Sequence, residues 1–149
     1  MINIFEHYQL GEKLYEQVVS GVYKKHNLTY MEFTVMMFLA NNKYDTASDI
    51  VKYRSLTKSH ISLAVKTLEE KGIIACKYQK NDRRTKHLQL TDLAKNIVED
   101  GRVAQKQFIE MLNCGLSDSD IEKIKDIFEI INENIKNNLA DFRRDNNAK

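Results

Sequence analysis

The sequence predicts a mainly α-helical protein with one small β-hairpin near its middle, and three observations lead to this fold class. Apolar residues recur at steps of three and four along most of the 149 residues. Two short segments, 73–79 and 86–90, instead have the length expected of strands, and the second alternates apolar and polar residues. The chain contains no proline, so only glycine and capping residues are available to end its helices.

Six helices are expected, and capping signals mark where several of them begin. Thr29 followed by Glu32, and Ser117 followed by Asp120, have the spacing of capping boxes. The expected helices cover residues 3–26, 29–41, 46–54, 57–71, 91–113 and 117–143, with Thr46, Thr57 and Thr91 as further candidate N-caps.

The hairpin is expected between the fourth and fifth helices. Gly72 can take the left-handed conformation that ends the preceding helix. Leu88 and Leu90 then alternate with polar residues along the second strand. The six residues KNDRRT (80–85) between the two strands are expected to form the hairpin tip.

Length and composition favour a single globular domain over residues 1–149, because 42% of the residues are hydrophobic and 30% are charged. No run approaches the roughly 18 apolar residues of a membrane span, and the N-terminus lacks a signal-peptide core. We therefore expect a cytoplasmic protein, in which Cys76 and Cys114 form no disulfide. The cysteines and the four histidines have no metal-ligand spacing, so no metal or cofactor is expected.

The formal net charge of +2 is distributed unevenly along the chain. Residues 43–91 carry 11 basic and 5 acidic side chains, whereas residues 92–142 carry 6 basic and 11 acidic ones. Positive charge gathered in one segment is typical of a local anion-binding region. The sequence has no nucleophile elbow and no glycine-rich phosphate loop, so we do not expect an enzyme.

The first and last helices have wide apolar stripes, which in the last helix include Ile124, Phe128, Ile131 and Ile135. A chain of this size has little core left to cover them. We therefore expect residues 1–26 and 91–143 to pack against a second copy as dimerisation helices. The alternative is that these helices only close the core of the monomer.

The segment 57–71 is the candidate recognition helix of a DNA-binding region over residues 29–91. One side of this helix is apolar, and the other carries short hydroxyls and lysines, which can donate to phosphates and fit a major groove about 12 Å wide. The alternative is a merely solvated face. The candidate DNA-binding residues here are Lys52, Arg54, Thr57, Lys58, Ser59, His60, Ser62 and Lys66.

The basic tip of the hairpin adds candidate residues for contact with the minor groove of DNA. A narrow minor groove attracts an inserted guanidinium, and we expect Arg84, at the apex, to enter it. Asp82 could orient this guanidinium through a charge-assisted hydrogen bond. A rigid surface turn alone would not need so many cations, because exposed ion pairs contribute only about 0–1 kcal/mol. The residues expected at phosphates are Lys80, Arg83 and Lys86.

The run LEEKGIIACKYQKNDRRTKHLQLT (68–91) resembles the MarR family of winged helix-turn-helix transcription regulators. The resemblance rests on the Lys-Gly turn, the basic wing with Asp-Arg-Arg, and the Leu-x-Leu-Thr that opens a long helix. The segments TASDI and TKSHISLAVKTLEEKG look like the helix pair of that motif. The resemblance implies a winged helix-turn-helix, with a wing over residues 79–86, flanked by long N- and C-terminal dimerisation helices.

The same resemblance implies a homodimeric repressor that binds a pseudo-palindromic operator in double-stranded DNA and responds to a small ligand or an oxidant. A small aromatic effector would bind where the first, second and fifth helices meet the DNA-binding region. The alternative for its methionine and aromatic residues is plain core. The residues that would line this pocket are His26, Tyr30, Met36 and Met37.

Two positions depart from the family pattern. Leu63 stands where an arginine or a polar residue is common, and Cys76 stands where a basic residue often begins the first strand. Two other functions stay open at this point. A cysteine-based redox-responsive regulator would need Cys76 or Cys114 to be exposed, with a lowered pKa. The second alternative is a winged-helix module that binds another protein and not DNA. The basic wing argues against this alternative.

Overall fold

The computed structural model describes residues 3–54, 56–79 and 82–147, with the side chains of Ile4, Gln79, Asp82, Arg83 and residues 142–147 left out. The chain divides into two compact units, one up to Ile109 and one from Glu110 onwards. Each unit is described by itself below. The organisation of residues 1–149 as a single domain therefore stays a prediction.

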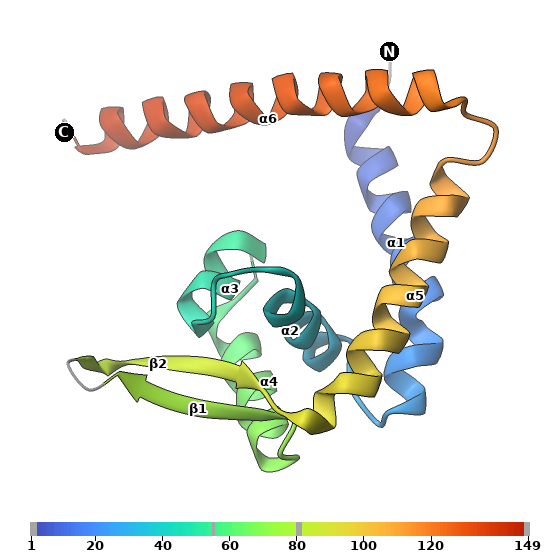
Figure 1. Cartoon of the computed structure of the whole chain (residues 1–149). Helices are drawn as coiled ribbons and strands as arrows, with labels where there is room; N and C mark the ends of the chain where they lie inside the picture. Colours follow the sequence, from blue (N-terminus) through green and yellow to red (C-terminus); the bar gives the residue numbers. More distant parts are fainter. Residues whose placement is uncertain (1–2, 55, 80–81, 148–149) are drawn as a thin grey trace. The chain divides into compact units, whose positions relative to one another are not determined.

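The first unit contains most of the helices and the hairpin (Figure 1). Its elements are α1 (Ile4–Lys25), α2 (Tyr30–Asn41), α3 (Ala47–Arg54), α4 (Lys58–Glu70), β1 (Ile74–Gln79), β2 (Asp82–Leu90), the short 3-10 helix η1 (Asp92–Ala94) and most of α5 (Lys95–Leu112). The second unit contains the end of α5 and the helix α6 (Asp118–Asn147). This arrangement confirms the predicted fold class, a mainly helical chain with one antiparallel hairpin.

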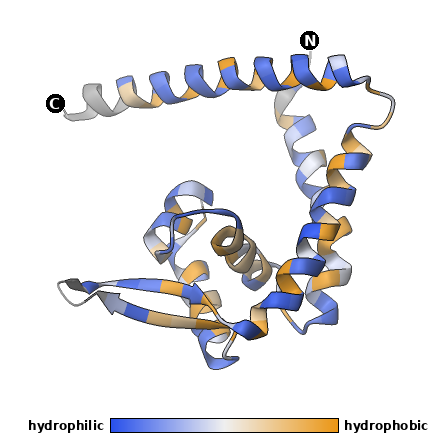
Figure 2. Cartoon of the chain, in the orientation of Figure 1, coloured by the Kyte–Doolittle hydropathy of each residue, from blue (hydrophilic) through white to orange (hydrophobic). Residues whose placement is uncertain are grey.

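The helix α2 lies at the centre of the first unit and is hydrophobic along most of its length (Figure 2). Met36 belongs to a buried cluster shared with α3, α4 and the hairpin, whereas Met37 belongs to a second cluster shared with α1 and α5. The α5 backbone approaches α2 so closely at Gly101 that an added Cβ would lie 2.6 Å from the Met37 sulfur. Packing on both sides thus fixes α2 as the support for its neighbours.

Most of the predicted caps are present. Thr29 and Glu32 form a reciprocal capping box, with Glu32 N–H to Thr29 Oγ1 at 3.1 Å and Thr29 N–H to Glu32 Oε2 at 2.9 Å. Gly72 has a positive φ of 69° just after α4, as predicted. Thr91 is the N-cap residue of the short helix η1, as predicted, although its side chain makes no capping hydrogen bond. Its hydroxyl instead lies 2.7 Å from the Gly72 carbonyl oxygen, which ties the end of β2 to the turn before β1.

The hairpin differs from the prediction in where its second strand begins. β2 starts at Asp82, four residues earlier than expected, so Arg83, Arg84 and Thr85 belong to a strand and not to the tip. Charged residues on an exposed strand give no apolar alternation, and this part of the strand therefore had no sequence signal. The predicted apical position of Arg84 is accordingly wrong, since Asp82 is already paired with Gln79.

The second unit exposes a continuous series of apolar residues along α6, which Figure 2 shows among polar ones. A shallow hollow of about 340 Å³ on this helix is lined by Ile131, Ile135 and Leu139, with two asparagines. None of the helices in the described part of the chain is both long and apolar enough to cross a membrane. The exposed apolar residues include Ile124, Ile127, Phe128, Ile130, Ile131, Ile135 and Leu139.

Candidate nucleic-acid interface

The helix α4 is two-faced in the structure as in the sequence. Its apolar side packs into the core, where Ile61 and Leu68 are fully buried and Ala64 and Val65 nearly so. The opposite side is exposed over the first two and a half turns. Burial of one face on α2, α3 and β1 therefore holds the other face toward solvent. The exposed residues there are Lys58, Ser59, Ser62, Leu63 and Lys66.

The N-terminal end of α4 presents exposed hydroxyl groups. Thr57 is the N-cap, and its Oγ1 accepts from the His60 N–H at 3.4 Å. The Thr57 and Ser59 hydroxyls lie 3.3 Å apart, and both residues, like His60, are exposed. A helix N-terminus carries partial positive charge and favours an anion, so this end of α4 is suited to a phosphate.

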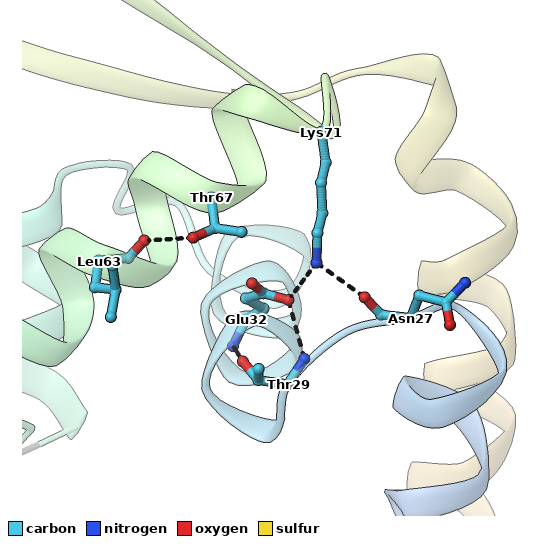
Figure 3. Close-up of polar contacts among 6 residues, drawn as sticks. All are labelled: Asn27, Thr29, Glu32, Leu63, Thr67 and Lys71. Carbon is cyan, nitrogen blue, oxygen red and sulfur yellow. Dashed lines mark hydrogen bonds and ion pairs between the residues drawn. The ribbon is translucent and has the colours of Figure 1, made fainter.

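The C-terminal end of α4 is held by an ion pair with a buried carboxylate (Figure 3). The Lys71 ammonium lies 2.8 Å from Glu32 Oε2 on α2 and donates to the Asn27 carbonyl oxygen at 2.9 Å. Glu32 is only 4% exposed and is the one buried charged side chain among the described residues. The pair therefore ties the end of α4 to the turn between α1 and α2.

A second ion pair connects α4 to the wing. Lys86 Nζ lies 2.9 Å from Glu69 Oε2, and the hydrogen bond from Lys86 lowers the pKa of the Glu69 carboxyl. On the same helix, Lys66 Nζ is 3.8 Å from Glu70 Oε1, with both side chains largely exposed. The carboxylates at this end of α4 thus offset part of the positive charge of Lys66 and Lys86, two predicted DNA-binding residues.

The other predicted DNA-binding residues have different placements. Lys52 is exposed at the end of α3, with its ammonium 5.3 Å from the centre of the Tyr53 ring. The guanidinium of Arg54 lies 5.9 Å from the centre of the Phe38 ring on α2. Arg54 is nevertheless exposed, and its predicted contact with DNA stays a prediction.

The wing is only partly described. Arg84 is exposed and lies where the pairing of β1 and β2 is irregular, between Lys86, which pairs with Tyr78, and Asp82, which pairs with Gln79. Lys80 lies outside the described residues, and so do the side chains of Asp82 and Arg83. The predicted bond between Asp82 and the Arg84 guanidinium therefore stays a prediction.

His87 anchors the root of the wing and is not at the exposed face of α4. Its Nδ1 lies 2.8 Å from Asp45 Oδ1, and the Leu88 N–H donates to the Asp45 carbonyl oxygen at 2.7 Å. Thr46 also pairs with His87 as an isolated β-bridge. These contacts fasten β2 to the segment before α3.

The residues predicted to line an effector pocket lie in different surroundings. Met36 and Met37 are fully buried in separate core clusters, which agrees with the plain-core alternative. His26 Nε2 lies 2.8 Å from Asp100 Oδ2, next to Lys25, and so joins α1 to α5. Tyr30 packs near Tyr23, with 5.9 Å between the ring centres.

Cys76 does not have the environment of a reactive thiol. Burial raises the pKa of the Cys76 thiol, and its hydrogen bond with Glu69 raises it further, whereas a redox-sensing cysteine needs a lowered one. Cys114 is exposed at the end of α5. In the part of the chain that the structure describes, no three His, Cys, Asp or Glu side chains lie close enough to hold a metal ion.

Similar proteins point to one family. A MarR family model matches residues 26–85, which span α2 to the first part of β2. No curated protein matches the sequence significantly. The solved structures that resemble this chain include several transcription regulators.

Three of these structures cover most of the chain. A putative MarR family transcriptional regulator from Listeria monocytogenes, complexed with a 26mer DNA, has a TM-score of 0.81 at 20% identity and covers 93% of this chain and 92% of its own. A MarR protein from Peptoclostridium difficile has a TM-score of 0.78 at 19% identity, covering 91% and 89%. The S. aureus MepR–DNA complex has a TM-score of 0.72 at 18% identity, covering 89% and 99%.

The match and the shared fold confirm the resemblance that the wing sequence predicted. Several of the similar structures are named transcriptional regulators, in line with the sequence prediction of a non-enzymatic regulator. Residues 26–85 of this chain thus match the MarR family, and the chain has the winged-helix fold of MarR-family transcription regulators.

Proposed function

We propose that this chain is a dimeric, sequence-specific DNA-binding transcription regulator. In this proposal α4 enters the major groove and the wing, residues 79–86, enters the minor groove. The observation that carries it is the exposed half of α4, where hydroxyls and lysines stand on a helix whose opposite face is buried. Two structures of the same fold were solved as DNA complexes, which supports the assignment.

The proposed contacts follow from the placement of the side chains. Ser59 and Ser62 are short and central on the exposed face, so they are suited to base edges. Arg84 is the candidate for the minor groove, and Lys80, Arg83 and Asp82 keep the wing roles predicted from the sequence. The residues proposed at phosphates are Lys52, Thr57, Lys58, His60, Lys66 and Lys86.

Dimerisation is proposed from the apolar residues that α6 and the start of α1 leave exposed. Phe5 and Tyr8 on α1, and Phe128 and Ile135 on α6, all expose about half of their surface or more. Exposed apolar area of this extent is typical of a protein–protein interface. A second copy of the chain is the proposed partner, and the resemblance to the MarR family further implies a repressor that responds to a small ligand.

Fluorescence anisotropy with the DNA upstream of the gene for this protein tests the proposal. We expect binding that weakens steeply as salt increases, because phosphate contacts release counterions. Light scattering should show a dimer, and Phe128→Asp should weaken it by placing a charge in the interface. A monomer at working concentration that binds no DNA even in dilute buffer would contradict the proposal, and would favour a protein-interaction module instead.

A further inference from the structure

Leu63 is an apolar side chain at the centre of the polar face of α4. It is 65% exposed, whereas the other large apolar residues of this helix, Ile61, Val65 and Leu68, are at most 6% exposed. Ser59 lies one turn before it and Lys66 one turn after it on the same face. Figure 3 shows Leu63 on α4 apart from the Glu32–Lys71 ion pair, so it has no part in anchoring the helix.

The chemistry of a leucine limits what it can recognise in a major groove. It has no hydrogen-bond donor or acceptor in its side chain, so it cannot satisfy the polar edges of guanine, cytosine or adenine. Thymine alone presents an apolar group there, its C5-methyl. Single exposed leucines are common on protein surfaces, but this one stands between a serine and a lysine on the face proposed to lose its water.

We propose that Leu63 contacts the C5-methyl group of a thymine and makes one base pair in each half-site specific for thymine. This inference rests on the proposed function, in which α4 lies in the major groove. Burial of one methyl group contributes about a fourfold change in affinity. Two half-sites therefore predict about a sixteenfold change when both methyl groups are removed.

Uracil substitution tests the contact directly, because uracil differs from thymine only by the missing methyl group. A duplex selected from a randomised library by the wild-type protein serves as the probe, and each thymine is replaced in turn. We expect one position in each half-site to lose about fourfold in affinity with the wild-type protein and nothing with Leu63→Ala. Leu93→Ala, which truncates a leucine that is 66% exposed on η1, is the matched control and should retain the full uracil penalty.

Each outcome has a separate meaning. A uracil penalty that is unchanged in Leu63→Ala, or a selected site in which no thymine shows a penalty, would overturn the role of Leu63 while leaving the proposed function intact. Failure of the wild-type protein to select any duplex would instead contradict the proposed function. Alanine is a strong helix former and position 63 is exposed, so Leu63→Ala is expected to fold, which a melting curve can check.

Discussion

The two ends of α4 differ in what their side chains contact. At the N-terminal end the hydroxyls and lysines are exposed, and residues 50–68 contain no acidic residue. At the C-terminal end Glu69 pairs with Lys86, and Lys71 pairs with the buried Glu32. The difference shows how one helix can be fixed in place and still present a surface, because the Lys71–Glu32 anchor lies at one end and the exposed residues Thr57, Lys58 and Ser59 lie at the other.

The largest effect is expected from breaking the anchor. Lys71→Met would leave the Glu32 carboxylate buried without a cationic partner, which costs about 3–5 kcal/mol of unfolding free energy. Chemical denaturation at neutral pH measures this loss. The double variant Glu32→Gln with Lys71→Met should regain much of it, since no charge is then left buried and Gln can still serve the capping box.

Lys25→Met is the control for this experiment. It removes an ammonium from an ion pair of the same length, 2.8 Å, but one in which the side chain of Asp100 is 36% exposed, against 5% for that of Glu32. An exposed pair contributes about 0–1 kcal/mol, so the loss should be small. Equal losses in Lys71→Met and Lys25→Met would show that the buried pair does not anchor α4.

The next largest effect is expected at the wing and concerns binding. Arg84→Ala should weaken binding to the selected duplex by about 1–3 kcal/mol if the guanidinium enters the minor groove. Anisotropy titrations measure this change. Lys95→Ala, which removes an exposed cation at the start of α5, should leave the affinity nearly unchanged. If Arg84→Ala bound as tightly as the wild type, the wing would have no such role.

A smaller and less specific effect is expected at the N-terminal end of α4. Lys58→Ala should weaken binding to all duplexes alike, because a phosphate contact carries no sequence information. The slope of log K against log salt should fall by about 0.9, the value for one phosphate contact. A loss restricted to the selected duplex would indicate that Lys58 reads a base edge instead.

The smallest effect is expected from the pH dependence of the Glu69–Lys86 pair. Because the pKa of Glu69 is lowered in the folded state, the pair stabilises the protein above the ordinary glutamate pKa of about 4.3. This contribution is lost as the pH falls through the lower, folded-state pKa. Urea unfolding between about pH 5 and 3 should therefore show a flatter decline of unfolding free energy in Glu69→Gln than in the wild type, and identical slopes would contradict the assignment.

Local features of the structure could be predicted from the sequence. The capping box at Thr29 and the glycine after α4 both depend on residues within a few positions of each other, and both are present. The two-faced character of α4 could be predicted for the same reason, because the spacing of apolar residues that produces it lies within one helix. The exposed DNA-binding candidates on α4 were therefore identifiable.

Features that depend on distant residues could not be predicted. Glu32 and Lys71 are 39 residues apart, and nothing near either residue indicates their pairing. The direction of the Arg54 side chain depends on a contact with Phe38 of α2, and residues near Arg54 in the sequence do not indicate this contact. The early start of β2 at Asp82 likewise depends on backbone pairing with Gln79, which charged residues do not signal.

Lysine acetylation with and without the selected duplex, followed by mass spectrometry, tests the difference between the two ends of α4 most directly. The extent of acetylation is measured at Lys58 and Lys71, one at each end of α4, in the wild-type sequence. The exposed Lys95 serves as the reference. We predict that the duplex protects Lys58 and leaves the reactivity of Lys71 and Lys95 unchanged. Protection of Lys71 equal to that of Lys58, or no protection of Lys58, would contradict the placement of the N-terminal end of α4 on DNA.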